Sequence, residues 1–515
     1  MLIAVTQPPA RPDVARAVGL FLVPYLLLGL FWAVSNPAIA APDENDHLVK
    51  ALALAHLDIG FPGPPAPAGT TDLGLVRNAS ITRIVLIPAR LSPDAYPCFR
   101  FQPQVTAACQ PSSPPVADGD LPVATPLGAY PPFLYPPVGR LAILGGDVTA
   151  AVLLGRLGVL AASMVLLALA CAHLVRWLGA RALAGVAMAL TPMAVFCFGI
   201  LNTSAVEILG ALGMAAVVTV YRWHPASLRD RRTLLVVLLC GTALVLSRQL
   251  GIVSMAALTV LLLALGGWRE VWAGLRERSP MMWATVAVPA VATLAVTIWE
   301  LRYDHPALLG PWASPESLRS FLVEQVPQLV QEGVGWFGWL DVRPPVAVNL
   351  VWVVAVAVLV GAALSVGGRR DRAVIVGMLV VALVVSYVTY SRAFFGIDAG
   401  LQGRHVLPIL AIVPIWSGAV LARRPAGPAA RPWRSWRVAV ALASVALPVV
   451  VLVGLYLNTQ RYAVGLDSGL GGLGGLWFVP AAQWAPPLGW TFWAVESLVA
   501  SVLLGVTWSR TLARS

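Results

Sequence analysis

Residues 346–366 read VAVNLVWVVAVAVLVGAALSV, a stretch without one charged side chain. It matches the roughly 20 apolar residues that an α-helix needs to cross the hydrocarbon core of a bilayer. Comparable runs recur along the chain, and the sequence therefore predicts an all-α, polytopic transmembrane helix bundle of about twelve spans. The runs lie near 18–34, 149–175, 182–200, 204–220, 233–247, 250–266, 281–299, 346–366, 373–390, 404–421, 438–457 and 488–508.

The composition agrees with a protein dissolved in lipid. Of the 515 residues, 58% are hydrophobic and only 11% are charged. Soluble domains carry about 25% charged residues, so membrane lipid is the expected partner. The net charge of +11 comes from arginines in short loops between apolar runs. This distribution is typical of membrane topology and not of a phosphate-binding face, so no nucleic-acid partner is expected.

The arginines also assign the two sides of the membrane. If residues 1–17 form a cytoplasmic N-terminus, alternation of the spans places every dense arginine cluster on the cytoplasmic side. The alternation holds only if residues 233–266, interrupted by Ser247-Arg248-Gln249, form two spans. Both termini are then cytoplasmic. The clustered residues are Arg176, Arg181, Arg222, Arg229, Arg231, Arg232, Arg269, Arg276, Arg278, Arg369, Arg370, Arg372, Arg423, Arg424, Arg431, Arg434, Arg437, Arg510 and Arg514.

This topology divides the chain into a first transmembrane helix at 18–34, an extracytoplasmic loop at 35–148 and a multi-span domain at 149–515. Further outer loops are expected at 300–345, 391–403 and 458–487.

Two cysteines, Cys98 and Cys109, share the first outer loop. Disulfides persist in extracytoplasmic compartments, so we expect these two residues to be bonded.

An acidic motif, Pro42-Asp43-Glu44-Asn45-Asp46-His47, follows the first span. If a helix begins at Pro42, then Asp43, His47 and Lys50 share one face. A carboxylate beside an imidazole suits general-base catalysis, and Asp43, Glu44 and Asp46 are the candidate ligands if a divalent cation binds. The alternative is that the acids only stabilise the positive end of the helix dipole.

Two arginines lie at the outer ends of apolar runs. Arg248 interrupts 233–266, and Arg404 follows Gln402-Gly403 at the start of 404–421. A guanidinium in such a place needs a partner, and a lipid phosphate is suitable because it accepts two parallel hydrogen bonds. The alternative is an arginine that reaches the interface or pairs with an internal Asp or Glu.

An aromatic motif, Gly335-Trp336-Phe337-Gly338-Trp339-Leu340-Asp341, precedes the 346–366 run. Its tryptophans either belong to the interfacial aromatic belt or stack on a sugar ring or a prenyl chain.

These stretches occur in an order that resembles the family of predicted membrane proteins called domain of unknown function 2142. The resemblance spans roughly residues 18 to 460 and rests on Pro42-Asp43-Glu44, Phe337-Gly338-Trp339-Leu340-Asp341, and Gln402-Gly403-Arg404 with Pro408. That family resembles the GT-C glycosyltransferases, which use polyprenyl-phosphate-linked sugars and carry an acidic motif in the first outer loop. This chain departs from the family pattern, which has a proline after the acidic pair followed by an alanine and a histidine. Here Asn45 and Asp46 precede His47.

The resemblance implies a GT-C-like glycosyltransferase of the bacterial cytoplasmic membrane that transfers a sugar from a polyprenyl-phosphate donor to a cell-envelope acceptor on the outer face. No cofactor is implied beyond the divalent cation considered above. The candidate catalytic residues are Asp43, Glu44, Asp46 and His47. The candidate substrate-binding residues are Arg248, Arg404, Gln402, Trp336, Trp339 and Asp341.

Two other functions stay open from the sequence: a transporter or flippase of lipid-linked glycans, and a non-catalytic envelope assembly protein. An enzyme requires Asp43, Arg248 and Arg404 to meet in one outward-facing cavity, which we expect Trp336 or Trp339 to border. A scaffold would leave them scattered.

Overall fold

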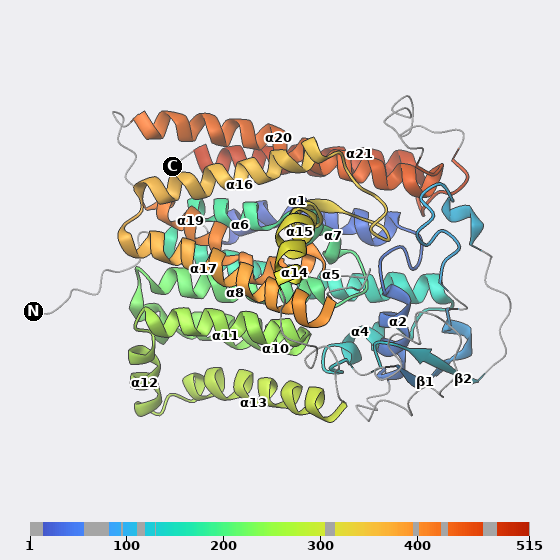
Figure 1. The fold of residues 1–515 in the computed structure, drawn as a ribbon, viewed down its shortest axis with the longest axis horizontal. Coiled ribbons are helices and arrows are strands. Elements are labelled where there is room, and N and C mark those ends of the chain that lie inside the picture. Colours follow the sequence, from blue (N-terminus) through green and yellow to red (C-terminus); the bar gives the residue numbers. More distant parts are fainter. Residues whose placement is uncertain are drawn as a thin grey trace, which may run out of the picture.

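The computed structural model describes residues 14–55, 82–93, 96–110, 119–128, 130–303, 315–394, 401–423, 431–466 and 482–513. Long helices run alongside one another, and a smaller layer of short helices and strands covers one end of the bundle (Figure 1).

In the described part of the chain, nine helices are long and apolar enough to cross a membrane, or up to eleven if each of two bent pairs counts as one span. The chain is therefore a multi-span helical membrane protein, while the count of twelve stays a prediction. The long elements are α1 (Val14–Ser35), α5 (Val148–Leu178), α8 (Ser204–Tyr221), α13 (Pro280–Tyr303), α16 (Val346–Val366), α17 (Arg369–Thr389), α18 (Gly403–Leu410) with α19 (Ile412–Ala422), α20 (Arg431–Ala463) and α21 (Gly489–Ala513).

Both bent pairs turn sharply. Helices α6 (Leu183–Ala189) and α7 (Pro192–Phe198) enclose 85°, and α11 (Gln249–Ala264) meets α12 (Trp268–Arg276) at 87°. Pro192 explains the first break, because proline cannot continue the hydrogen-bond ladder of the preceding helix. The second break falls at Gly266, which has a positive φ of 99° that favours glycine.

The stretch from 231 to 264 forms two helical segments that meet at Arg248, while the prediction that each is a separate span stays untested. Helix α9 (Arg231–Val236) continues through a π-helical turn (Val237–Gly241) into α10 (Thr242–Ser247). The backbone is extended at Arg248 (φ −164°, ψ 172°), and α11 begins at the next residue. The break places the Arg248 side chain at the end of both segments.

Helix α8 lies in the middle of the bundle, and 94% of its residues are buried. It packs against α5, α10, α11, α18 and α19. By contrast, α13, α16 and α17 expose apolar side chains such as Val291, Val354 and Val380 on their outer faces. An exposed apolar face of this kind is what lipid contact requires.

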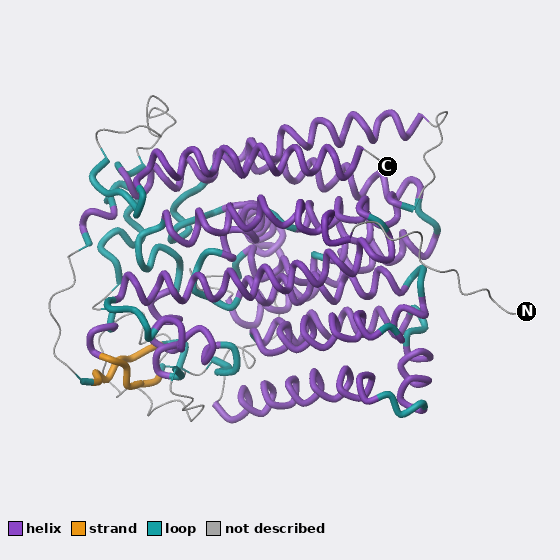
Figure 2. Tube along the Cα trace, turned by 180° about the vertical axis from the view of Figure 1, so that it is seen from behind, coloured by secondary structure: helices purple, strands orange, loops and turns teal. Residues whose placement is uncertain are grey.

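The covering layer contains an element that helical periodicity does not predict. Strands β1 (Arg83–Pro88) and β2 (Asp120–Thr125) pair antiparallel, with Arg83 opposite Thr125 (Figure 2). Helix α2 (Glu44–Ala53) packs on both strands and on α4 (Tyr135–Ala142). The expected loop 35–148 is therefore partly structured, and the chain is not wholly α-helical.

A transverse helix crosses the bundle, seen end-on in Figure 1. It comprises α14 (Pro315–Ser320), a π-helical turn (Phe321–Gln325) and α15 (Val326–Gly335). The remaining short elements are 3₁₀ turns at Ala89–Leu91, Ala107–Cys109, Ala180–Ala182 and Pro225–Arg229, and a π-helical turn at Tyr390–Phe394.

Candidate functional site

The acidic loop between α1 and α2 is held by its backbone. Each carbonyl from Asn36 to Ala40 accepts a hydrogen bond from a side chain of another part of the chain. The donors in order are Arg156 Nη1 to Asn36 (3.0 Å), Arg156 Nη2 to Pro37 (2.8 Å), Gln110 Nε2 to Ala38 (3.1 Å), Trp339 Nε1 to Ile39 (3.0 Å) and the Tyr462 hydroxyl to Ala40 (2.9 Å). This bracing fixes the position from which Asp43 projects.

Helix α2 begins at Glu44, so the expected start at Pro42 is wrong. Asp43 has φ 62° and ψ 10°, in the left-handed region, and its side chain caps no backbone N–H. Such a conformation costs on the order of 1 kcal/mol and persists only where the surroundings fix it. The carboxylate is 51% exposed, and its Oδ2 lies 3.9 Å from Nη2 of Arg404. Asp43 is thus a constrained carboxylate that solvent and a ligand can reach.

Glu44, the next residue, is fully buried. Its Oε1 and Oε2 accept hydrogen bonds from Nε (2.8 Å) and Nη2 (2.7 Å) of Arg156 in α5. Its Oε1 also accepts the backbone N–H of Leu201 at 2.9 Å. Both carboxylate oxygens are therefore occupied by the protein, and Glu44 fastens α2 to α5.

Asp46 and His47 point into the covering layer. Asp46 Oδ1 accepts a hydrogen bond from the Thr125 hydroxyl of β2 at 3.2 Å. His47 Nδ1 lies 2.9 Å from the Tyr135 hydroxyl of α4, and the two rings are nearly parallel. Both side chains are buried, and their contacts join α2 to its neighbours.

Burial lowers the pKa of His47 well below its usual range, and the positive charges of Arg248, Arg404 and Lys50 lower it further. His47 is therefore neutral near pH 7. Because both arginines lower the pKa of His47, its ring lies close enough to Arg248 and Arg404 to interact with their charges.

Lys50 is the chain's only lysine, and sequence reasoning did not assign it a role. Its Nζ donates to the carbonyls of Leu127 and Gly128 (2.9 Å each) and of Tyr130. Burial lowers the pKa of Lys50 to about 7, although the negative charge of Glu300 partly offsets this by raising the pKa. The three carbonyl acceptors match the three N–H donors of the ammonium form. Lys50 thereby holds the turn that follows β2.

Arg404 opens α18 and is only 4% exposed. Apart from the contact with Asp43, its Nε and Nη1 have no hydrogen-bond partner within the described ranges. The helix start is fixed by Glu332 of α15, whose Oε2 accepts the backbone N–H of Gly403 at 2.7 Å. A buried guanidinium with unsatisfied donors is costly, so this site fits an anion.

Arg248 approaches the same region from the break between α10 and α11. Its Nε donates to the Thr203 hydroxyl at 3.0 Å and lies 4.0 Å from Oε2 of Glu207. Burial raises the pKa of Tyr130. The positive charges of Arg248 and Arg404 lower this pKa, and the negative charge of Asp43 raises it further. Arg404 therefore lies beside Asp43, and Arg248 lies close enough to influence the same tyrosine, while one cavity shared by all three residues stays a prediction.

The other predicted binding residues lie around this region in different roles. Gln402 donates its backbone N–H to Nδ1 of His405 (3.3 Å) at the start of α18. Asp341 forms a buried ion pair with Arg461 (2.8 Å) and accepts the backbone N–H of Trp339 at 3.1 Å. Trp339 and Asp341 thus brace the acidic loop, since Trp339 also holds the Ile39 carbonyl.

Trp336 packs under the guanidinium of Arg343, whose carbon lies 4.2 Å from a ring centroid. No contact described here joins Trp336 to Asp43 or to either arginine, so its expected place beside them stays a prediction.

The carboxylates expected to hold a metal do not converge. Across the residues that the structure describes, no group of three or more His, Cys, Asp or Glu side chains could hold a metal ion. Asp43, Glu44 and Asp46 face Arg404, Arg156 and Thr125 respectively, so they do not fit a shared cation.

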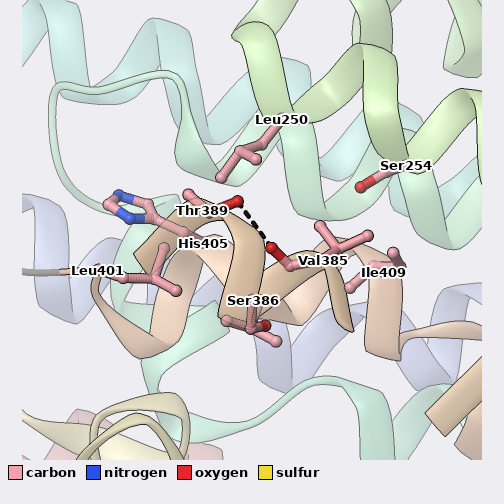
Figure 3. A pocket seen from close by; sticks show the side chains of 9 residues that line it. Leu250, Ser254, Val385, Ser386, Thr389, Leu401, His405 and Ile409 are labelled. Atoms are coloured by element: carbon pink, nitrogen blue, oxygen red, sulfur yellow. Dashed lines mark hydrogen bonds between the residues drawn. The ribbon is translucent and has the colours of Figure 1, made fainter. Parts of the chain in front are cut away.

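A mostly apolar pocket lies close in the sequence to both arginines, and Figure 3 shows the side chains that line it. It is small, with a cavity volume of about 10 Å³, and lies between α11, α17 and α18. Two of its lining residues follow the arginines closely in the sequence. Leu250 is two residues after Arg248, and His405 is the residue after Arg404. The full lining is Leu250, Ser254, Val385, Ser386, Thr389, Leu401, His405, Val406 and Ile409.

Cys98 and Cys109 form a disulfide with a Cα–Cα distance of 6.1 Å. The loop that it closes is attached to α20, because Arg461 Nη2 donates to the Phe99 carbonyl at 2.6 Å and Nη1 to the Val105 carbonyl.

The chain belongs to the family of predicted membrane proteins designated DUF2142, whose model matches residues 26–413. A stretch of 89 residues is 37% identical to a DNA primase of human herpesvirus 2 (strain HG52). That similarity covers 16% of this chain and only 8% of the length of the primase. No solved structure matches the chain.

Proposed function

We propose that the protein is a membrane glycosyltransferase that transfers a sugar from a polyprenyl-phosphate donor to a cell-envelope acceptor on the outer face of the membrane. One observation carries the proposal. The buried guanidinium of Arg404, with two nitrogens unsatisfied within the described chain, lies 3.9 Å from the reachable carboxylate of Asp43 and beside an apolar pocket.

A phosphodiester suits the two arginines. The donor phosphate carries one negative charge, and it gains a second as the bond to the sugar breaks. Buried guanidinium groups aimed at a charge that grows during the reaction stabilise the transition state more than the ground state. Arg404 supplies Nε and Nη1, and Arg248 adds a second positive charge that acts on the same histidine, His47.

The pocket suits the lipid part of the donor. Its walls are mostly aliphatic, and it lies among helices long enough to cross the membrane. The cavity of about 10 Å³ has room for about one water, so a prenyl chain would have to part these helices to enter, and its phosphate would then lie near Arg404. Arg404 and the pocket residue His405 are consecutive in α18, so one helix would position both parts of the lipid.

Asp43 is the best-placed base. In the reaction it accepts the proton of an acceptor hydroxyl while the hydroxyl oxygen bonds to the anomeric carbon. The bond from that carbon to the phosphate oxygen breaks, its electron pair stays on the phosphate, and Asp43 later releases the proton to water. Glu44 is less suitable because Arg156 occupies both of its oxygens, and Asp46 is less suitable because it is buried with its Oδ1 bonded to Thr125.

Asp43→Asn tests the proposal, because it removes the base and keeps the shape of the side chain. The purified protein in liposomes is given polyprenyl-phosphate hexoses and pentoses labelled in the sugar, and membranes from a strain lacking the gene supply the acceptor. We expect transfer to fall about 100-fold or more. Asp120→Asn, on the exposed edge of β2, is the matched control and should transfer normally.

Transfer by Asp43→Asn at the rate of the natural protein would contradict the proposal. Movement of the labelled donor across the bilayer without transfer would instead support a flippase.

A further inference from the structure

A second feature of the outer layer is an exposed aromatic side chain on the disulfide-closed loop. Phe101 is 59% exposed, and its backbone adopts φ 55°, a left-handed conformation that is strained for a bulky residue. Strain of this kind at an exposed position is typical of functional sites.

Three aromatic rings surround Arg100, the residue before Phe101. The guanidinium carbon lies 3.4 Å from the ring centroid of Tyr96 and 4.9 Å from those of Phe101 and Trp339. Phe101 and Tyr96 each meet Trp339 edge to face, at 5.5 Å and 6.0 Å. Nε of Arg100 is buried and has no hydrogen-bond partner among the described residues. We call Tyr96, Arg100, Phe101 and Trp339 the aromatic platform.

The platform rests on a rigid support. The disulfide closes its loop, and the backbone N–H of Leu466 donates to the Pro103 carbonyl at 2.7 Å. The Thr106 hydroxyl donates to Oε1 of Gln483 at 2.9 Å. These contacts tie the loop to the end of α20 and to the chain before α21, at the end of the bundle that carries α2 and the strands (Figure 1).

The platform is also linked to the candidate active site. Trp339 belongs to it, and the same side chain donates from Nε1 to the Ile39 carbonyl, four residues before Asp43. Asp341 and Arg461 then connect Trp339 to the disulfide-closed loop. A ligand on the platform would therefore contact the structure that positions Asp43.

We propose that the aromatic platform binds a sugar ring of the acceptor glycan, an inference that rests on the proposed function. A pyranose ring has an apolar C–H face, which stacks on an exposed aromatic ring such as Phe101, and hydroxyls at its rim. The guanidinium of Arg100 offers N–H donors to those hydroxyls beside the ring.

The test is glycan binding to the full chain in lipid nanodiscs, measured by saturation-transfer NMR and titration. The probes are a hexasaccharide of β-linked glucose and a hexasaccharide of galacturonic acid. We expect at least one to bind and its affinity to fall about tenfold in Phe101→Ala. Phe101→Gly is the second variant, because it removes the ring while relieving the positive φ and so keeps the loop folded. Leu86→Ala, which truncates an equally exposed apolar side chain on β1, is the matched control and should bind normally.

Binding does not require transfer, so Asp43→Asn separates the two claims. Asp43→Asn should bind the hexasaccharide normally and transfer no sugar, whereas a natural-sequence protein that binds it through Phe101 but transfers no sugar would keep the platform and remove the proposed function. Absence of binding by both probes, or equal binding by Phe101→Gly and the natural sequence, would overturn the platform. Loss of self-association in Phe101→Gly without any glycan binding would also overturn it and assign the ring to a protein contact.

Discussion

Two neighbouring carboxylates have opposite surroundings. Asp43 is half-exposed and strained, whereas Glu44 is buried and saturated by Arg156 and the Leu201 backbone. The left-handed backbone at Asp43 causes this difference, since it ends the loop and turns the two side chains in different directions. A sequence motif can therefore locate a site without showing which of its acids reaches the substrate.

Glu44→Gln should destabilise the protein strongly. It leaves the charge of Arg156 buried without its counter-charge, which typically costs about 3–5 kcal/mol. Thermal unfolding in detergent measures the effect. Glu277→Gln is the matched control, because Glu277 is 61% exposed in its pair with Arg229 and such pairs contribute about 0–1 kcal/mol. Normal stability of Glu44→Gln together with lost transfer would instead show that Glu44 acts in catalysis.

His47 should make the protein sensitive to acid. Because its pKa in the folded state is lowered, the unfolded chain binds a proton near pH 6.5 that the folded protein does not. The free energy of unfolding therefore falls as the pH drops below that range, by about 1.4 kcal/mol per pH unit for this one group. His47→Gln should lose this part of the slope between pH 6.5 and 5. The other histidines are present in both proteins, so equal slopes would contradict the neutral buried state of His47.

At the scale of elements, most of the span positions could be predicted because hydrophobic runs of about 20 residues have few other uses. The split at Arg248 was also predictable, since a single span would have placed a charge near its centre. The strands β1 and β2 were not, because their alternation is short and lies among proline-rich segments. The bracing by Arg461 and Tyr462 depends on contacts across more than 350 residues, which no local pattern encodes.

Arg156 is recognisable from the sequence as a residue that needs a buried partner. It is a charged residue within a long apolar run, and such a residue nearly always has a buried partner. The partner is Glu44, one of the acids of the first outer loop, and this pairing argues against a catalytic role for Glu44.

Helices α6 and α19 cross at two glycines, which makes their contact sensitive to a single methyl group. A Cβ at Gly185 would lie 2.4 Å from the Pro414 carbonyl oxygen. Gly185→Ala should therefore destabilise the protein by about 1–3 kcal/mol in thermal unfolding. Gly361→Ala in α16 is the matched control, because nothing lies within 4 Å of its added Cβ. There the loss of glycine should stabilise by roughly 0.5–1 kcal/mol, and equal effects at the two positions would contradict the close crossing.

At the scale of the molecule, two groups of arginines have different surroundings. Those of the short loops gather at the end of the bundle opposite α2 and the strands, as in the loops on either side of α12 and the loop between α16 and α17 (Figure 1). Arg156, Arg248, Arg404 and Arg461 are instead buried nearer the covered end. The first kind orients the protein, and assigning its end to the cytoplasm stays a prediction. The second kind holds the acidic loop or faces the candidate site.

The most direct test of the account is an experimental structure of the protein in nanodiscs with decaprenyl phosphate. We predict phosphate oxygens about 3 Å from Nε and Nη1 of Arg404, with Arg248 nearby. The first isoprene units should occupy the pocket between Leu250 and Ile409, and the Asp43 carboxylate should face the phosphate. A phosphate bound elsewhere, or an Arg404 whose two nitrogens are satisfied by the protein's own acceptors while the pocket stays empty, would contradict the proposed site.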